Sequence, residues 1–132
     1  MTLVVDASVI VEIALGDDSP KRRRLVKLLL EDAPLVATDY VDIEVANAVG
    51  RAMRRGVLSM GEAQRVSDRV ARLPLMRIPT RALTDRLVEL MHNHSAYDSG
   101  YIAIAEALRA PLVTLDRGMA TSPVAMCPFV LV

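Results

Sequence analysis

Short apolar segments alternate with longer amphipathic segments along this chain, and this alternation is what most restricts the folds open to it. Apolar runs typical of buried strands cover residues 3–6, 35–38, 75–78, 112–115 and 129–132. The longer segments carry apolar residues at helical spacing and cover residues 9–16, 20–33, 40–56, 59–74, 80–91 and 98–110. Because parallel strands need helical crossovers, this pattern predicts an α/β fold with a central parallel sheet of four to five strands and helices on both faces.

The length and the residue types fit one globular unit. The chain has 132 residues, shows no linker or repeat and is 52% apolar, so we expect residues 1–132 to form a single domain. Its one cysteine, Cys127, excludes an intrachain disulfide and a four-cysteine zinc site. No apolar run is long enough for a membrane span and the N-terminus lacks a basic signal-peptide start, so we expect a cytoplasmic protein.

Charge is balanced overall and clustered locally. Sixteen Lys and Arg oppose sixteen Asp and Glu, which excludes a strongly basic coat for nucleic acid but not a basic patch. A neutral, rather apolar chain tends to associate, so we expect a partner or a dimer. The cations gather on three predicted helices, as Lys21, Arg22, Arg23, Arg24 and Lys27, then Arg51, Arg54 and Arg55, then Arg65, Arg69 and Arg72. Most should face solvent, and contact between some of them and nucleic acid is an open alternative.

Four carboxylates fall at one edge of the predicted sheet. Asp6 and Asp116 each follow an apolar strand, Glu44 lies about two turns into the helix after the second strand, and Asp98 opens the helix before the fourth. The carboxyl ends of parallel strands form the functional crevice of such sheets. Converging carboxylates repel one another, and a divalent cation such as Mg²⁺ or Mn²⁺ removes that repulsion. The sequence therefore favours a metal site at this edge.

Each acid also has a simpler explanation when it is taken alone. Asp6 and Asp116 follow strands, where Asp often only turns the chain. Asp98 at a helix start would serve as an N-cap, and Glu44 within a helix would ordinarily face solvent. These explanations stay open, although it is less plausible that all four hold together at one edge.

Other polar residues near these acids carry weaker signals. Ser8 and Thr114 lie two residues from a strand-end acid and could bond a carboxylate or a phosphate, or could serve local structure only. His92 and His94 lack further partners for a zinc site, so a structural role is favoured. No glycine-rich phosphate loop occurs in the sequence.

The order of these residues resembles the motifs of PIN-domain ribonucleases. VVDAS at 4–8 is similar to the opening motif of that family, and DIEVANA at 42–48 to its second acidic motif. YDSGYIAIA at 97–105 and LVTLD at 112–116 are similar to the third and fourth. The resemblance spans residues 3–117, and the length and motif spacing resemble the VapC toxins of bacterial toxin–antitoxin pairs.

The resemblance implies a three-layer α/β/α sandwich and Mg²⁺- or Mn²⁺-dependent endonucleolytic cleavage of RNA. It also implies a homodimer and a cognate VapB-like antitoxin that blocks the site. Asp6 and Asp98, helped by Glu44, would hold the ion, whereas Asp116 would bind a second ion or orient the attacking water. By the same carry-over, the site would comprise Asp6, Glu44, Asp98 and Asp116, with Ser8 and Thr114 as accompanying polar residues.

Two positions depart from the family pattern. Ser99 and Gly100 replace the small apolar pair, commonly alanine, that is expected after the third acid. Glycine lowers helix propensity by about 0.8–1 kcal/mol relative to alanine and could loosen the position of Asp98. Arg117 places a cation beside Asp116, where it could contact an RNA phosphate.

Three other classes of protein remain as alternatives. A non-catalytic binding module with the same fold would hold a partner without cleaving it. A metal-dependent DNA nuclease would use the same four acids. A receiver-like phosphoacceptor would need a second acid near the first strand and a lysine near the last, and the only lysines are Lys21 and Lys27.

Overall fold

Five parallel strands form the central sheet of the chain. The computed structural model describes residues 1–29, 31 and 33–132. The strands are β1 (Leu3–Val5), β2 (Leu35–Thr38), β3 (Leu75–Ile78), β4 (Leu112–Thr114) and β5 (Phe129–Leu131). Their order is β3-β2-β1-β4-β5, and every neighbouring pair is parallel. The predicted parallel sheet is confirmed, and all five apolar runs belong to it.

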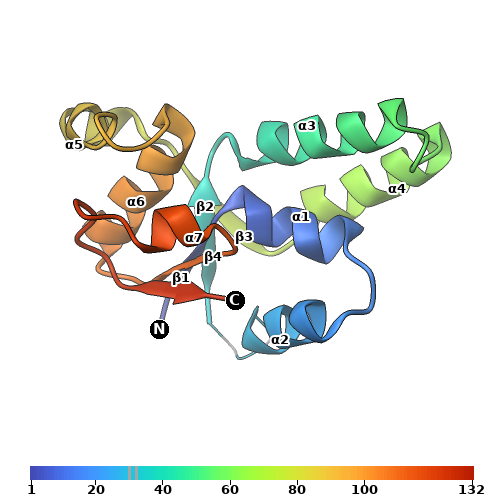
Figure 1. Ribbon diagram of the computed structural model, residues 1–132, viewed down its shortest axis with the longest axis horizontal. Coiled ribbons are helices and arrows are strands. Elements are labelled where there is room, and N and C mark those ends of the chain that lie inside the picture. The colour runs from blue at the N-terminus through green and yellow to red at the C-terminus, as the bar shows by residue number, and fades with distance from the viewer. Residues whose placement is uncertain (30, 32) are drawn as a thin grey trace.

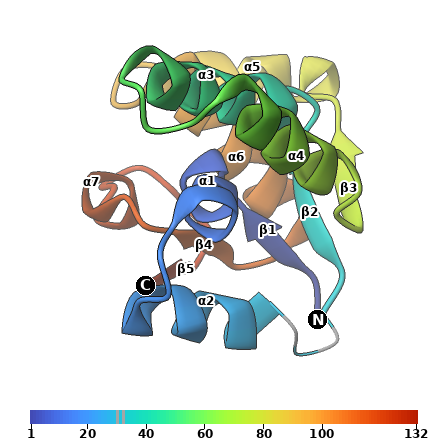
Figure 2. The ribbon, with the colours of Figure 1, turned by 90° about the vertical axis from the view of Figure 1, so that its right-hand side faces the viewer.

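Helices cover both faces of this sheet, as predicted. The helices are α1 (Ala7–Leu15), α2 (Pro20–Leu29), α3 (Val41–Arg54), α4 (Met60–Ala71), α5 (Thr84–Leu90), α6 (Ala96–Leu108) and α7 (Arg117–Ala120). Helix α6 packs on β1, β2 and β4 with α5 beside it, whereas α1 lies against the opposite face with α2 next to it (Figures 1 and 2). Helices α3 and α4 pack on each other and on α1. The chain is therefore an α/β/α sandwich, and none of its described helices has the length and apolar character needed to cross a membrane.

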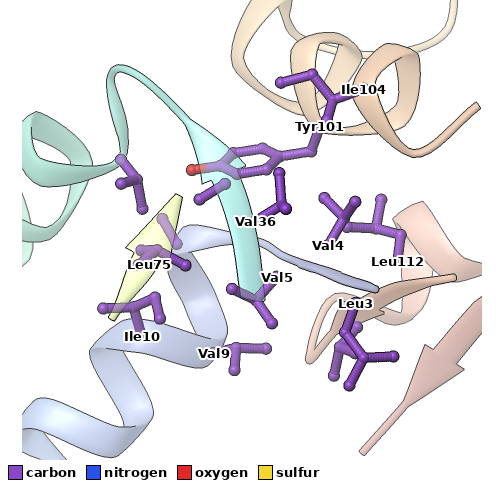
Figure 3. Packing of buried hydrophobic residues seen from close by; sticks show 14 of the residues in the cluster. Leu3, Val4, Val5, Val9, Ile10, Val36, Leu75, Tyr101, Ile104 and Leu112 are labelled. Carbon is purple, nitrogen blue, oxygen red and sulfur yellow. The ribbon is translucent and has the colours of Figure 1, made fainter. Parts of the chain in front are cut away.

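The core explains why the strand and helix segments are so apolar. Strand β1 lies in the middle of the sheet, and all three of its residues are buried because both of its faces are covered. Helix α6 is buried without interruption from Ser99 to Ala105. Figure 3 shows Tyr101 and Ile104 of α6 packed toward Val4 and Val36 of the sheet. A helix that is apolar on all sides belongs in the interior, so α6 holds a rigid position relative to β1 and β2.

Several helix ends differ from their predicted positions. Helix α6 begins at Ala96, because the Ser95 hydroxyl, and not Asp98, caps it by accepting the Asp98 backbone N–H at 3.1 Å. Thr80 makes no side-chain cap; a 3₁₀ turn (Arg81–Leu83) follows it, and α5 starts only at Thr84. The short helix α7 was not predicted, since four residues give too little periodicity to detect. Part of the predicted 20–33 helix falls on residues 30 and 32, which lie outside the described part of the chain.

Candidate active site

The candidate site lies at the point where the strand order reverses. Strands β2 and β3 lie on one side of β1, and β4 and β5 lie on the other. In parallel sheets a crevice opens beyond the carboxyl ends of the strands at such a point. Asp6 follows β1 and Asp116 lies two residues beyond the end of β4, whereas Glu44 and Asp98 come from the first turns of α3 and α6. Glu44 therefore lies closer to its helix start than predicted, and the four acids come from four different elements that meet at one edge.

Asp6 is the most firmly held of the four acids. Its side chain is buried, with 4% exposure, although it is a carboxylate. Its Oδ1 accepts hydrogen bonds from the Ser8 hydroxyl at 2.5 Å and from the Val9 backbone N–H at 3.2 Å, and its Oδ2 accepts one from the Thr114 hydroxyl at 2.5 Å. A carboxylate offers about four lone-pair directions, so about one is left for another partner. The bond from Val9 also makes Asp6 the N-cap of α1.

Two hydroxyl groups connect Asp6 to the turn that follows β4. The Leu115 backbone N–H donates to Ser8 Oγ at 3.2 Å, and the Asp116 backbone N–H donates to Thr114 Oγ1 at 2.9 Å. Each hydroxyl then donates its own proton to Asp6. The bonds therefore fix Asp116 relative to Asp6, and both Ser8 and Thr114 bond a carboxylate, which is one of the two predicted roles. Asp116 Oδ1 accepts from the Met119 backbone N–H at 3.1 Å, so Asp116 also caps α7.

Glu44 is directed by a tyrosine that the sequence did not single out. The Tyr101 hydroxyl donates to Glu44 Oε1 at 2.7 Å, and the Tyr101 side chain itself is buried. Glu44 shares one face of α3 with the buried residues Val41 and Ala48, so its position in the helix already turns it inward, although it is only half-buried. The bond from Tyr101 then fixes the direction of its side chain, so Glu44 does not face solvent freely.

The Ser99–Gly100 departure is explained by close packing against Tyr40. A Cβ added to Gly100 would overlap Tyr40 Oη and would lie 3.0 Å from Tyr40 Cζ and 3.2 Å from Thr80 Cγ2. The Tyr40 hydroxyl donates to the Tyr97 carbonyl at 2.7 Å, and the Tyr40 ring packs edge-on against Tyr97 and Tyr101 with centroids 5.6 and 5.8 Å apart. Glycine is therefore required for the contact between α6 and Tyr40, and it packs tightly instead of loosening the helix.

The carboxylates raise one another's affinity for protons. Burial is the largest cause that raises the pKa of Asp6, and the charge of Asp98 adds to it, while bonds from Ser8, Thr114 and Val9 oppose it. Burial likewise raises the pKa of Glu44, and the charges of Asp98 and Asp6 add to it against the bond from Tyr101. These mutual effects show that the side chains lie within electrostatic range of one another.

Asp98 connects the remaining acid to this group. Its pKa is raised by burial and then by the charge of Asp116, whereas His94 and a bond from Ser95 lower it. His94 itself lies 2.6 Å from Ser122 Oγ through Nε2, in accord with the structural role predicted for it. Asp98 thus interacts with all three other acids and is the electrostatic centre of the set.

The residues present fit a hydrated divalent cation better than a fully protein-bound one. Among the residues that the structure describes, no three His, Cys, Asp or Glu form a ready-made metal cluster. Mg²⁺ is usually held by one or two carboxylates and several waters, and does not require such a cluster. Hard carboxylate oxygens and mutual repulsion are the features that such an ion compensates. The donor set is therefore compatible with the predicted metal.

Arg117 lies at the edge of this group. It is exposed and is the first residue of α7, directly after Asp116. No ion pair of the described residues involves it. Its predicted contact with an RNA phosphate stays a prediction.

Comparison with known proteins places the chain in a family. The family profile described as PIN domain matches residues 3–122. Ribonuclease VapC9 of Mycobacterium tuberculosis is 33% identical over 130 residues, which cover 98% of each chain. In fold, the crystal structure of PAE2754 from Pyrobaculum aerophilum has a TM-score of 0.74 at 21% identity, covering 98% of this chain and 84% of that one. VapBC2 from Rickettsia felis, bound to a DNA fragment from their promoter, has a TM-score of 0.69 at 16% identity, covering 98% of this chain and 99% of that one. The extent of the profile match and the identity to VapC9 along nearly the full length show that the chain belongs to the PIN-domain family, among the VapC proteins.

Proposed function

We propose that the chain is a metal-dependent endoribonuclease, the toxin of a VapBC-type toxin–antitoxin pair. The observation that carries this proposal is the meeting of Asp6, Glu44, Asp98 and Asp116 at the sheet edge, where three of the four have raised pKa values. The relatives named ribonuclease VapC support RNA as the substrate. Membership of the PIN-domain family removes the receiver-like alternative.

The ion that this site would take is Mg²⁺, with Mn²⁺ as a substitute. Asp6 and Asp98 are the ligands that we propose, with Glu44 beside them and Asp116 next to a second ion or the attacking water. When bound, the ion would lower the pKa of a water and stabilise the negative charge that develops on the phosphodiester.

The chain's own residues position the reacting groups. Ser8 and Thr114 hold Asp6 in one orientation, with about one lone pair left for a further partner. The bond to Met119 leaves Asp116 Oδ2 open to accept a hydrogen bond from the attacking water. Tyr101 fixes the orientation of Glu44. Arg117, directly after Asp116, is the residue that we propose to contact the phosphate of the substrate. Groups held before the reaction begins need no reorganisation during it.

The proposal extends to the partners of the chain. The fold similarity to VapBC2, bound to a DNA fragment from their promoter, supports a VapB-like antitoxin as partner. We also propose that residues 1–132 act as one PIN domain and assemble as a homodimer. Sedimentation of the purified chain at several concentrations tests the dimer, and a monomer at all concentrations would contradict it.

The function is tested by cleavage of end-labelled single-stranded RNA by the purified protein. Reactions contain Mg²⁺, Mn²⁺ or EDTA, and they compare the wild type with Asp98→Asn. Asp39→Asn is the matched control, because Asp39 is an exposed acid that also follows a strand of this edge. We expect cleavage that needs metal, survives in Asp39→Asn and is lost in Asp98→Asn.

The ends of the products test the chemistry. Attack by water should leave 5′-phosphate and 3′-hydroxyl ends, whereas 2′,3′-cyclic phosphate would show attack by the 2′-hydroxyl and would refute the proposed mechanism. A parallel reaction with single-stranded DNA decides between the two nuclease classes. Full activity of Asp98→Asn would refute the site, and absence of both cleavage and metal binding would favour the non-catalytic binding module.

A further inference from the structure

A groove between α1 and α3 leads away from the acidic edge. It encloses about 840 Å³. Ser8, Glu44 and Tyr97 line the end next to the proposed site, and Asn47, Arg51 and Arg54 line the far end. A substrate chain bound at Glu44 can therefore continue along α3 without leaving the groove.

The distance from Glu44 to the far end of the groove follows from the geometry of α3. Arg51 is seven residues after Glu44, which is close to two helical turns, so both side chains share one face of α3. At about 1.5 Å per residue, Arg51 lies about 10 Å and Arg54 about 15 Å from Glu44 along the helix axis. These distances are longer than a single phosphate group. Arg51 and Arg54 would therefore contact phosphates further along the nucleic-acid backbone than the one next to Glu44.

Arg54 is folded back toward the groove. A Cβ added to Gly50 would lie 3.1 Å from Arg54 Nη1, so the guanidinium covers the space that a side chain at Gly50 would occupy. Gly50 itself lines the groove. Arg51 and Arg54 are both exposed, and no ion pair found among residues 1–29, 31 and 33–132 involves either of them.

The groove is negative at one end and positive at the other. Among the described residues that line it, Glu12 is the one carboxylate besides Glu44, and Glu12 Oε2 lies 3.5 Å from Lys21 Nζ. That ion pair cancels the charge of Glu12, so the two arginines give the far end a net positive charge. Guanidinium groups bind phosphate with two parallel hydrogen bonds and bind nucleic-acid backbone without regard to sequence.

We propose that Arg51 and Arg54 form a phosphate-binding subsite for the RNA backbone on one side of the bond that is cut. This inference rests on the proposed function, because it requires RNA to occupy the acidic edge. Continuity with Glu44 and the polarity of the groove favour an RNA strand over an acidic protein segment. The subsite holds the substrate and takes no part in the bond cleavage itself.

Binding in EDTA tests the subsite without any cleavage. Fluorescence anisotropy measures the Kd of a fluorescein-labelled single-stranded RNA from low to moderate salt for the wild type and for R51A/R54A. R69A/R72A is the matched control, because these two arginines are exposed residues at the end of α4 and do not line the groove. Each phosphate contact that a variant removes takes about 0.7 from the slope of log K against log salt for single strands.

We expect R51A/R54A to bind RNA about tenfold more weakly than the wild type, with a salt slope smaller by about 1.4. R69A/R72A should match the wild type, and R51K/R54K should keep most of the slope because lysine retains the charge. A thermal melt of each variant checks the fold. If the salt slope of R51A/R54A equals that of R69A/R72A, the two arginines do not bind RNA phosphates and the subsite is overturned. That conclusion holds even if R51A/R54A weakens the binding of a protein partner.

Cleavage kinetics separate failure of the subsite from failure of the proposed function. With metal present, R51A/R54A should raise KM about tenfold and leave kcat within about twofold, since the two arginines bind the ground state and the transition state equally well. Equal KM values for R51A/R54A and R69A/R72A would reject the subsite while cleavage by the wild type upholds the nuclease. Absence of cleavage by the wild type would reject the nuclease. The salt slopes measured in EDTA would still decide whether Arg51 and Arg54 bind RNA.

Discussion

The two halves of the acidic edge are built in different ways. In the strand half, Asp6 accepts three hydrogen bonds, and two hydroxyls tie it to the turn after β4. In the helix half, Glu44 and Asp98 project from the first turns of α3 and α6 and are only half-buried, and Glu44 receives a bond from Tyr101. The strand half is therefore a fixed support, whereas the helix half depends on how two helices pack.

Two buried threonines at strand ends also differ in how their hydroxyl groups are used. Thr114 ends β4 and Thr38 ends β2, and neither side chain is exposed. The Thr114 hydroxyl joins the Asp116 backbone N–H to Asp6, whereas Thr38 Oγ1 is buried without a hydrogen-bond partner among the described residues. The hydroxyl at the end of β4 is therefore part of the site's hydrogen bonding, whereas the hydroxyl at the end of β2 is not.

The largest effect on stability is expected from removing the Thr114 hydroxyl. Thr114→Val leaves the buried Asp6 Oδ2 without its partner and removes the acceptor of the Asp116 N–H, which should lower the free energy of unfolding by about 3 kcal/mol. Thr38→Val removes a hydroxyl that makes no hydrogen bond of normal geometry among the described residues, so it should change stability by less than about 1 kcal/mol. Urea unfolding measures both. Equal losses for the two variants would show that the two threonine hydroxyls contribute alike to stability.

The next effect comes from filling the space at Gly100. Gly100→Ala places a methyl group against Tyr40 and Thr80, and overpacking of this kind should cost about 2 kcal/mol. Tyr40→Phe removes the hydroxyl that the methyl group overlaps, so the double variant should recover about 1 kcal/mol in a double-mutant cycle. Additive losses would show that Tyr40 and Gly100 are not coupled.

A smaller effect, on activity, is expected from Tyr101→Phe. The variant keeps the buried ring and removes the hydrogen bond to Glu44, so it should fold normally and lower kcat about tenfold. A purely structural role for the hydroxyl would appear as lower stability instead. In a Glu44→Gln background the same change should have little further effect, and an undiminished tenfold loss there would show that Tyr101 does not act through Glu44.

The smallest effect is a pH-dependent gain in stability at Asp98. The pKa of Asp98 is raised in the folded chain, first by burial and then by Asp116, so its ionisation weakens the fold. The stability that the protonated form contributes is present below the unfolded pKa of about 3.8 and is lost as the pH rises through the folded value.

Asp98→Asn cannot ionise and should escape that loss. In EDTA, the stability of the variant relative to the wild type should increase between pH 3.5 and pH 7 by less than about 1 kcal/mol, because Asp98 is partly exposed to solvent. Thermal melts at the two pH values measure the change, and any effect of the substitution that does not depend on pH cancels between them. A relative stability that stays constant with pH would contradict the mutual repulsion of the acids.

The sequence predicted the strand half better than the helix half. Asp6 and Asp116 could be placed because acids at or just beyond the carboxyl ends of parallel strands share an edge. Ser8 and Thr114 could be marked because they lie two residues from those acids, and both turned out to bond Asp6. These interactions depend on short stretches of chain and on one strand pairing.

The helix half depends on interactions between distant segments. Tyr101 reaches Glu44, and Gly100 packs on Tyr40, only because α6 packs on β2, and the chain runs from β2 through Tyr40 into α3. Tyr101 lies in the middle of an apolar helix, where a tyrosine is expected to be part of the core. One available signal was that a buried tyrosine hydroxyl needs a partner. Gly100 appeared unfavourable by helix propensity alone, because propensity carries no information on a neighbour about sixty residues away.

If the four acids form one cation site, calorimetric titration of Mn²⁺ and Mg²⁺ into the purified chain will detect it. We expect binding to the wild type and to Asp39→Asn, with strong weakening in both Asp6→Asn and Asp98→Asn, one variant from each half. Equal binding to the wild type and to these two variants, or no binding to the wild type, would show that the acids do not form such a site.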